Sequence, residues 1–140
     1  MDVDLRNRTY GFFVEHGRPP RPRELGDPAE VEAGWRELHE AHALVLEPAE
    51  PARIRMLNPF SCVPTPHRVQ TGGRWWYGNC AWDSLGVIAA LGGDGRYVTS
   101  CPDCADELEL EVRGNELTAS GHVFHCLVPA RLWWEDIVFT

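Results

Sequence analysis

Lysine is missing from this 140-residue sequence. All 13 basic residues are arginine, and with 21 acidic residues the formal net charge is −8. The charges are spread along the chain, so neither half offers the basic surface that nucleic-acid phosphates require, and a nucleic-acid partner is not expected. A basic set made only of arginine is typical of GC-rich codon usage, which indicates a bacterial source.

Long apolar runs are also missing. No stretch of about 18 apolar residues is present, so the sequence predicts no membrane span and no membrane partner. The N-terminus, MDVDLRNRTYGFF, lacks the apolar stretch and cleavage site of a signal peptide. These absences predict a cytoplasmic protein. Its five cysteines, at positions 62, 80, 101, 104 and 126, are therefore expected to be reduced thiols or metal ligands.

The remaining composition is that of a folded globular protein. Hydrophobic residues make up 44% of the chain and charged residues 24%, which excludes a disordered chain. The length allows one ordinary domain or two small lobes that share a core.

The first 58 residues are expected to form a helical lobe followed by a hairpin. An opening helix should end at Gly17. Asp27 followed by Pro28 is a good start for a second helix, because an N-cap acceptor precedes proline at the first helical position. Residues 44–57 alternate like two short strands around a proline-rich turn. This order of elements predicts a winged-helix-like lobe over residues 1–58.

A winged helix often binds DNA, but the charges of this lobe oppose that function. The second helix carries only Arg36 as a basic residue, against the acidic residues Glu30, Glu32, Glu37 and Glu40. Phosphate repulsion would hinder its docking into a DNA groove. A winged helix reused as a scaffold is the better interpretation, since a fold does not determine a function.

A connecting segment rich in Pro, Ser and Thr follows, and a second lobe is expected over residues 59–140. It should hold one helix, at residues 80–91, and several short strands. The strands are expected at residues 74–77, 96–100, 107–113, 122–128 and 137–139. One helix packed on a mostly antiparallel sheet makes the fold class α+β.

Cys80 and Asp83 carry the strongest chemical signal of the sequence. In a helix over residues 80–91, Cys80 lies in the first turn, and Asp83 lies three residues later on the same face. Unpaired backbone N–H groups and the helix dipole favour thiolate at this end, so a lowered pKa is predicted for Cys80. The nearby carboxylate opposes that shift unless the pair shares a proton or a metal.

Both residues also have ordinary structural roles. A free cysteine is often buried and fills core space, and aspartate in a first helical turn is a common stabilising choice. The pattern Cys-x-x-Asp is short, so its spacing alone leaves both interpretations open.

A wider segment around this pair resembles a known family. The run RWWYGNCAWDSLGVIAALGGDGRYVTSCP is similar to the core of the organomercurial (alkylmercury) lyase family. There a cysteine, with an aspartate three positions on, opens a helix that leads through a small-residue turn to a strand ending in Cys-Pro. The segment PFSCVPTPHRV resembles the family's Pro-Phe-Ser…Pro-Thr segment, and residues 5–57 resemble its helical N-terminal part.

The resemblance implies cleavage of a carbon–mercury bond by protonolysis, without an organic cofactor. Mercury is a soft metal that thiolates bind well. Cys80 would attack the mercury of a small organomercurial substrate, and Asp83 would pass a proton to the departing carbon. Both residues would then hold the mercury(II) product until small thiols or a mercuric reductase removed it. Trp75, Trp76 and Trp82 could shape a pocket for the organic group, although core packing is the commoner role of such rings.

The family also implies a second catalytic cysteine after a late strand, in a segment like Trp133–Thr140. The sequence has no cysteine after Phe139. The chain is therefore either a shortened form or a variant that binds metal without cleaving carbon–mercury bonds. Cys62 and Cys126 are candidates to replace the missing thiol, with a buried structural role as the default for both.

Cys101 and Cys104, in the motif Cys-Pro-Asp-Cys between two expected strands, resemble the knuckle of a zinc ribbon. His122, His125 and Cys126 offer further ligands at a spacing near that of structural zinc sites. If these three lie on a strand, however, only one of the histidines can join Cys126. A zinc site, a second thiol site and two free thiols in a turn all stay open.

Three classes of function follow. The first is an organomercurial lyase that acts through Cys80 and Asp83. The second is a non-catalytic, thiol-based homologue that binds a heavy metal such as Hg, Cu or Zn. The third is a winged-helix regulator or a biosynthetic enzyme that uses the same pair on a metal-free substrate.

Overall fold

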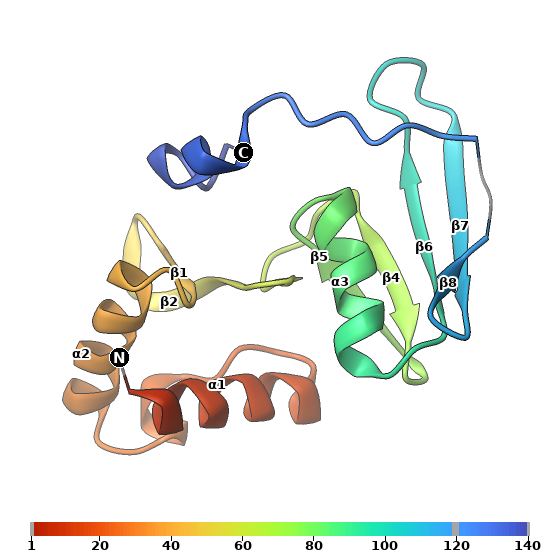
Figure 1. Cartoon of the computed structure of the whole chain (residues 1–140). Coiled ribbons are helices and arrows are strands. Elements are labelled where there is room, and N and C mark those ends of the chain that lie inside the picture. Colours follow the sequence, from red (N-terminus) through yellow and green to blue (C-terminus); the bar gives the residue numbers. More distant parts are fainter. Residues whose placement is uncertain (1, 119–120, 140) are drawn as a thin grey trace.

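The computed structural model describes residues 2–118 and 121–139 of the chain (Figure 1). Its main helices begin and end at local signals. Asp2 and Asp27 accept backbone N–H groups in the first turns of α1 and α2. Gly17 and Gly92 end α1 and α3 in the left-handed conformation that glycine adopts easily. The helical segments are α1 (Val3–His16), η1 (Pro22–Glu24), α2 (Pro28–Glu40), α3 (Ala81–Leu91) and η2 (Ala130–Glu135).

One antiparallel sheet runs through the part of the chain that the structure describes. Its strands are β1 (Val45–Glu47), β2 (Glu50–Leu57), β3 (Phe60–Ser61), β4 (Arg68–Thr71), β5 (Arg74–Gly78), β6 (Gly95–Ser100), β7 (Glu107–Arg113) and β8 (Glu116–Leu117). They lie in the order β1-β2-β3-β5-β4-β6-β7-β8, and each neighbouring pair is antiparallel. Strand β3 therefore joins the hairpin β1–β2 to the rest of the sheet.

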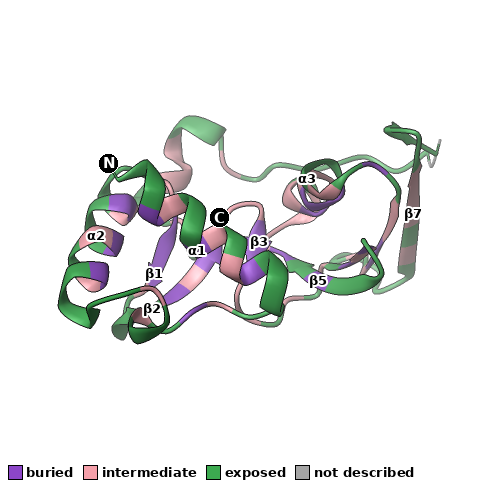
Figure 2. Ribbon diagram, turned by 90° about the horizontal axis from the view of Figure 1, so that it is seen from below, coloured by how far each residue is buried: buried purple, intermediate pink, exposed green. Residues whose placement is uncertain are grey.

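The core begins between the N-terminal helices and the β1–β2 hairpin. Figure 2 shows the buried residues of α2 on its side facing β1. Trp35 of α2 is fully buried, and its indole N–H donates to Oγ1 of Thr9 at 3.0 Å. The ring of Phe13 in α1 lies 5.3 Å from that of Phe60 and 5.6 Å from that of Trp76. These aromatic contacts extend the core from the helices into β3 and β5.

Helix α3 packs on the other half of the sheet. Its buried residues are Ser84, Val87 and Ile88, and its partners are strands β3 to β6. Gly78, the last residue of β5, lets the helix approach closely, because a Cβ at this position would clash with Oγ of Ser84. The first turn of α3 therefore lies directly against the end of β5.

The segment after β8 returns across the molecule. It runs from the far edge of the sheet toward the N-terminal helices and ends in η2 (Figure 1). The ring of Trp134 stacks on His42, with 3.9 Å between centroids and 5° between planes. No helix among the described residues is long and apolar enough to span a membrane.

The α+β class, the mostly antiparallel sheet and its packed helix are confirmed, as are both N-terminal helices and the hairpin after them. The division into residues 1–58 and 59–140 and the likeness to a winged helix stay predictions. Three strands were not predicted, namely β3, β4 and β8.

Two predicted strands are wrong. Residues 122–128 contain no strand, and residues 137–139 form a turn. The first segment is rich in apolar and β-branched residues, but in the structure its backbone is not part of the sheet, whose last strand is β8. Such residues form a strand only where a neighbouring strand supplies the hydrogen bonds.

Candidate active site around Cys80 and Asp83

The structure brings Cys80 and Asp83 together at the start of α3. Cys80 is the N-cap residue, and its sulfur accepts the backbone N–H of Asp83 at 3.4 Å. The carbonyl oxygen of Cys80 accepts the Oγ–H of Ser84 at 2.8 Å and its backbone N–H at 3.0 Å. Ser84 is fully buried. These contacts hold Cys80 at the N-terminal end of α3, with its thiol toward the turn that carries Asp83.

Asn79 positions the carboxylate of Asp83. Its amide nitrogen lies 3.1 Å from Oδ2 of Asp83, 3.1 Å from Oδ1 of Asn58 and 3.3 Å from the carbonyl oxygen of Pro59. Its amide oxygen is buried, with no hydrogen-bond partner among the residues that the structure describes. The sequence alone offered no reason to select Asn79, because its partner Asn58 lies 21 positions away.

Burial shapes the acidity of both groups. The pKa of Cys80 is raised, chiefly by burial. The N–H of Asp83 lowers it in part, and the negative charge of the Asp83 side chain raises it further. The lowered pKa predicted from the helix end is therefore wrong, because desolvation of the thiolate outweighs the backbone contact. Burial also raises the pKa of Asp83, against hydrogen bonds from Asn79 and Cys80.

Two tyrosines lie in the electric field of this pair. Burial raises the pKa of Tyr97, and the charge on Cys80 raises it further. Burial also raises the pKa of Tyr10, to which Asp83 and Cys62 add smaller effects of the same sign. The Tyr10 hydroxyl is hydrogen-bonded to the carbonyl oxygen of Ala43 at 2.8 Å. Neither tyrosine was a candidate from the sequence, since their approach to the site depends on how the chain folds.

Cys62, a candidate for the second thiol, is mostly buried. Its pKa is raised to about 12 by burial, against a backbone hydrogen bond from Leu57. Such a thiol stays protonated at neutral pH and reacts poorly. Its replacement of a second catalytic cysteine stays a prediction.

His67 lies beside Tyr97, on the connecting segment that precedes β4. Its Nδ1 lies 2.7 Å from the Tyr97 hydroxyl, and burial lowers its pKa. The carbonyl oxygen of His67 accepts the backbone N–H of Gly78 at 3.0 Å. His67 therefore lies beside the end of β5, two residues before Cys80.

The three candidate pocket tryptophans have different surroundings. Trp76 belongs to the core, beside Phe13 and Phe60. Trp75 points to the opposite face of β5, as alternation along a strand requires, and lies near the guanidinium groups of Arg68 and Arg96. Only Trp82 lies on the same helical turn as Cys80 and Asp83.

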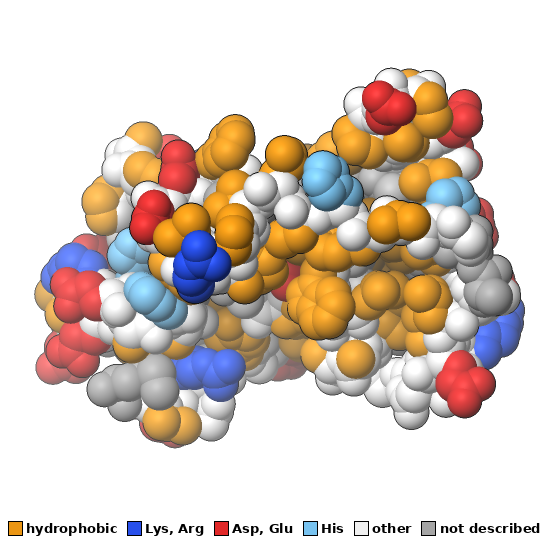
Figure 3. Space-filling view, turned by 45° about the horizontal axis from the view of Figure 1, so that its top comes forward, with side chains coloured by type: hydrophobic (Ala, Val, Ile, Leu, Met, Phe, Trp, Pro, Cys, Tyr) orange, Lys and Arg blue, Asp and Glu red, His pale blue; other side chains and the backbone are white. Residues whose placement is uncertain are grey.

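Trp82 forms part of an exposed apolar surface. Its side chain is 63% exposed, and its ring lies 6.3 Å from that of Phe124 in the returning C-terminal segment. An apolar group bound next to Cys80 would find contacts at Trp82. Figure 3 shows apolar side chains gathered across the middle of one face of the molecule.

Cys101 and Cys104 occupy the turn between β6 and β7. The backbone N–H groups of Cys104 and Asp103 and the thiol of Cys104 contact the Cys101 sulfur and lower its pKa. Cys126 is exposed, and its thiol donates to the carbonyl oxygen of Val128 at 3.1 Å. In the described part of the chain, no three His, Cys, Asp or Glu side chains are grouped as a metal site. The zinc site at Cys101 and Cys104 stays a prediction.

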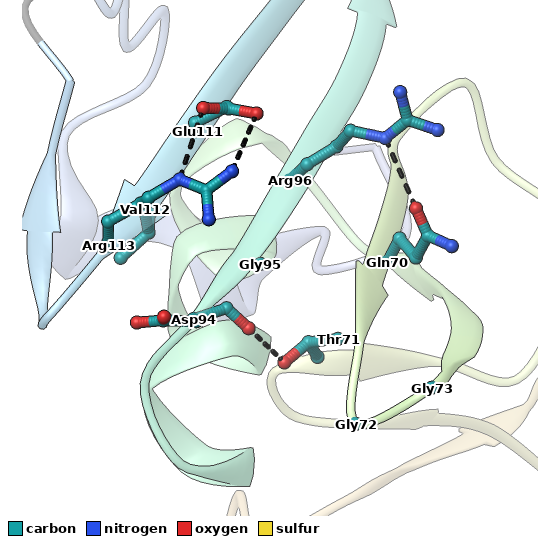
Figure 4. A pocket seen from close by; sticks show the side chains of 10 residues that line it. All are labelled: Gln70, Thr71, Gly72, Gly73, Asp94, Gly95, Arg96, Glu111, Val112 and Arg113. Carbon is teal, nitrogen blue, oxygen red and sulfur yellow. Dashed lines mark hydrogen bonds and ion pairs between the residues drawn. The ribbon is translucent and has the colours of Figure 1, made fainter.

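Two surface hollows lie away from Cys80. One, of about 440 Å³, borders the beginning of β6 (Figure 4). Its charged groups are largely satisfied by one another, as in the contact of Arg113 with Glu111 at 3.4 Å and that of Arg96 with Gln70 at 3.2 Å. The other, of about 580 Å³, lies between α2, the β1–β2 hairpin and residues 134–138. Neither hollow contains Cys80 or Asp83. The turn that carries this thiol and this carboxyl is therefore the better candidate site.

Comparison with known proteins matches the chain to a protein family and to solved structures. A family model described as alkylmercury lyase matches residues 60–140. A solved structure, the mercury-bound form of MerB2, shares the fold with a TM-score of 0.65 at 20% sequence identity. The match covers 86% of this chain and 61% of the other, so this chain spans less than two thirds of that protein. No curated protein matches the sequence.

Proposed function

The chain belongs to the alkylmercury lyase family, and on that premise we propose that it cleaves carbon–mercury bonds in organomercurial compounds by protonolysis. The observation that carries the proposal is the contact of 3.4 Å between the Cys80 sulfur and the backbone N–H of Asp83, inside the segment that the family model matches. A soft thiol and a carboxyl that can carry a proton thus share one helical turn. This reaction requires both groups.

Cys80 would bind the mercury of the substrate. The raised pKa of its thiol means that it meets the substrate protonated. As sulfur bonds to mercury, the thiol proton passes to Asp83. The S–H bond breaks, an S–Hg bond forms, and the carboxylate becomes a carboxylic acid.

Asp83 would then protonate the organic group. Burial raises its pKa, which helps the carboxyl to hold a proton, and Asn79 keeps it in position through the hydrogen bond of 3.1 Å. The carbon–mercury bond breaks, and its electron pair forms the new C–H bond. One organomercury cation and one proton give one hydrocarbon and one mercury(II) ion, with no oxidant or reductant. Trp82 would contact the organic group.

Mercury(II) would remain on Cys80 and Asp83 until another thiol removed it. Small thiols are the simplest acceptors, because soft ions exchange readily between sulfur ligands. A mercuric reductase is a candidate partner that would consume the released ion.

Benzene release from phenylmercury in excess small thiol tests the proposal. The parent chain is expected to release benzene, and Cys80→Ser and Asp83→Ala are expected to abolish the release. Cys126→Ser tests the exposed candidate for the second thiol; because the proposed reaction uses only Cys80 and Asp83, this variant should keep the parental rate.

The alternative function, heavy-metal binding without cleavage, has a distinct signature. In that case the parent chain would bind phenylmercury through Cys80 and release no benzene. That result would overturn the lyase proposal.

A further inference from the structure

The turn between β6 and β7 presents two thiols to solvent. Strand β6 ends at Ser100, and the motif Cys101-Pro102-Asp103-Cys104 follows. The turn is closed by two backbone hydrogen bonds, from Cys101 N to Asp106 O at 2.8 Å and from Ala105 N to Cys101 O at 2.9 Å. Cys101 is partly exposed and Cys104 is exposed. The turn therefore holds two accessible sulfurs on a closed, hydrogen-bonded frame.

The two thiols belong to one turn. Cys101 and Cys104 lie three residues apart within the turn that the Ala105 N–H closes on the Cys101 carbonyl oxygen. The first and fourth residues of a turn lie close together, so both sulfurs can reach a single soft ion.

This turn lies near the candidate active site. Thr99, two residues before Cys101, has its hydroxyl 3.5 Å from Nδ1 of His67, and the carbonyl oxygen of His67 accepts the N–H of Gly78 at 3.0 Å. Gly78 is two residues before Cys80. Figure 1 shows the β6–β7 connection at the same end of the sheet as the start of α3. Few residues thus separate the two sites.

We propose that Cys101 and Cys104 form a second binding site, specific for a soft divalent ion, which accepts mercury(II) from Cys80. Its role as an acceptor rests on the proposed lyase function, whereas its ability to bind mercury(II) does not. Structural zinc sites take four protein ligands, whereas two thiolates are sufficient for a soft ion such as mercury(II). The pair therefore fits mercury(II) better than zinc.

The transfer is a ligand exchange that balances without a redox step. The Cys101 and Cys104 sulfurs each form a bond to mercury, and the bonds of mercury to the Cys80 sulfur and the Asp83 carboxylate break. Of the two protons that leave the pair of thiols, one returns to the Cys80 sulfur and the other goes to solvent, and Asp83 is again a carboxylate. Cys80 is then a free thiol again and can bind the next substrate.

Binding of mercury(II) chloride to a Cys80→Ser chain tests the site without any cleavage reaction. In competition with a small monothiol, this chain is expected to retain one equivalent of mercury(II) and to show ultraviolet absorption from mercury–thiolate bonds. Adding Cys101→Ser or Cys104→Ser should weaken binding by about 10²–10⁴-fold, because the second sulfur no longer binds intramolecularly. Adding Cys126→Ser removes the other exposed thiol and should leave the affinity unchanged. A loss of affinity like that of Cys101→Ser would overturn a site made by Cys101 and Cys104 alone.

Two results would contradict the second site. If the Cys80→Ser chain fails to retain mercury(II), or retains it unchanged after Cys101→Ser and Cys104→Ser, the second site is wrong. Circular dichroism of each variant verifies that the fold is intact. A failure of the lyase proposal shows separately, as a parent chain that binds mercury(II) at this turn but releases no benzene from phenylmercury.

Discussion

The side-chain amide nitrogen of Asn79 lies 3.1 Å from Oδ2 of Asp83 and, on its other side, 3.1 Å from Oδ1 of Asn58. One side chain therefore joins the first turn of α3 to the segment between β2 and β3. Because the Asp83 carboxyl is partly buried, this hydrogen bond has a large effect on its orientation and charge.

Asn79→Ala is expected to raise the pKa of Asp83 further. The hydrogen bond from Asn79 favours the ionised carboxylate, and its removal leaves burial less opposed. The midpoint of Asp83 ionisation, followed by carboxyl carbon NMR, should move to higher pH. Asn58→Ala keeps the hydrogen bond between Asn79 and Asp83 and serves as the control. An unchanged or lower pKa in Asn79→Ala would contradict the assignment.

Gly78→Ala is expected to destabilise the fold by about 1–3 kcal/mol, because the added methyl group meets Ser84 at a close helix–strand contact. Gly11→Ala is a matched control. Gly11 lies inside α1 with open space around the missing Cβ, so this change should stabilise the fold by about 0.5–1 kcal/mol. Urea unfolding measures both. Equal effects of the two substitutions would rule out the close contact.

Thr9→Val is expected to cost about 1–3 kcal/mol of stability, because it leaves the buried indole N–H of Trp35 without its acceptor. Thr9→Ser keeps the hydroxyl and should be much milder. The free energy of unfolding in urea compares the two. A valine variant as stable as the serine variant would show that the hydrogen bond contributes little.

Cys62 is expected to react last among the thiols. At pH 9 its pKa of about 12 leaves it almost fully protonated, whereas Cys104 is exposed. Labelling with iodoacetamide, followed by peptide mass spectrometry, should modify Cys104 quickly and Cys62 only very slowly until the chain unfolds. Labelling of Cys62 at the rate of Cys104 in the folded chain would be inconsistent with its burial.

The helices could be predicted because their signals are local. Asp27 followed by Pro28, and Gly17 after an apolar-rich segment, specify helix ends within a few residues. Strand β4 was missed because Arg68–Thr71 is short and mostly polar, and its pairing with both β5 and β6 depends on distant segments. For residues 122–128 the prediction was wrong in the opposite way, since their apolar residues favour a strand but no neighbouring strand pairs with them.

In the candidate site, too, the local features could be predicted from the sequence and the features that depend on distant segments could not. Cys80 and Asp83 were predictable as a pair, because three residues in a helix bring side chains together whatever the rest of the chain does. The pKa values of the two groups were not predictable, because their burial depends on how α3 packs against β3 and β5. Trp75 and Trp76 are adjacent in sequence, yet one is exposed and the other is in the core. The way β5 pairs with its neighbours decides that Trp76 is buried and Trp75 is exposed.

We propose that Asp83 delivers a proton to a carbon whose mercury is held by Cys80. Loading the chain with one equivalent of phenylmercury, without added thiol, tests this step when the adduct is followed by intact-protein mass spectrometry. The parent adduct is expected to lose its phenyl group as benzene and to keep mercury. Asp83→Asn should keep the whole phenylmercury adduct, and Cys80→Ser should not support phenyl loss. A parent adduct that persists unchanged, or an Asp83→Asn adduct that loses its phenyl group at the parental rate, would contradict proton delivery by Asp83.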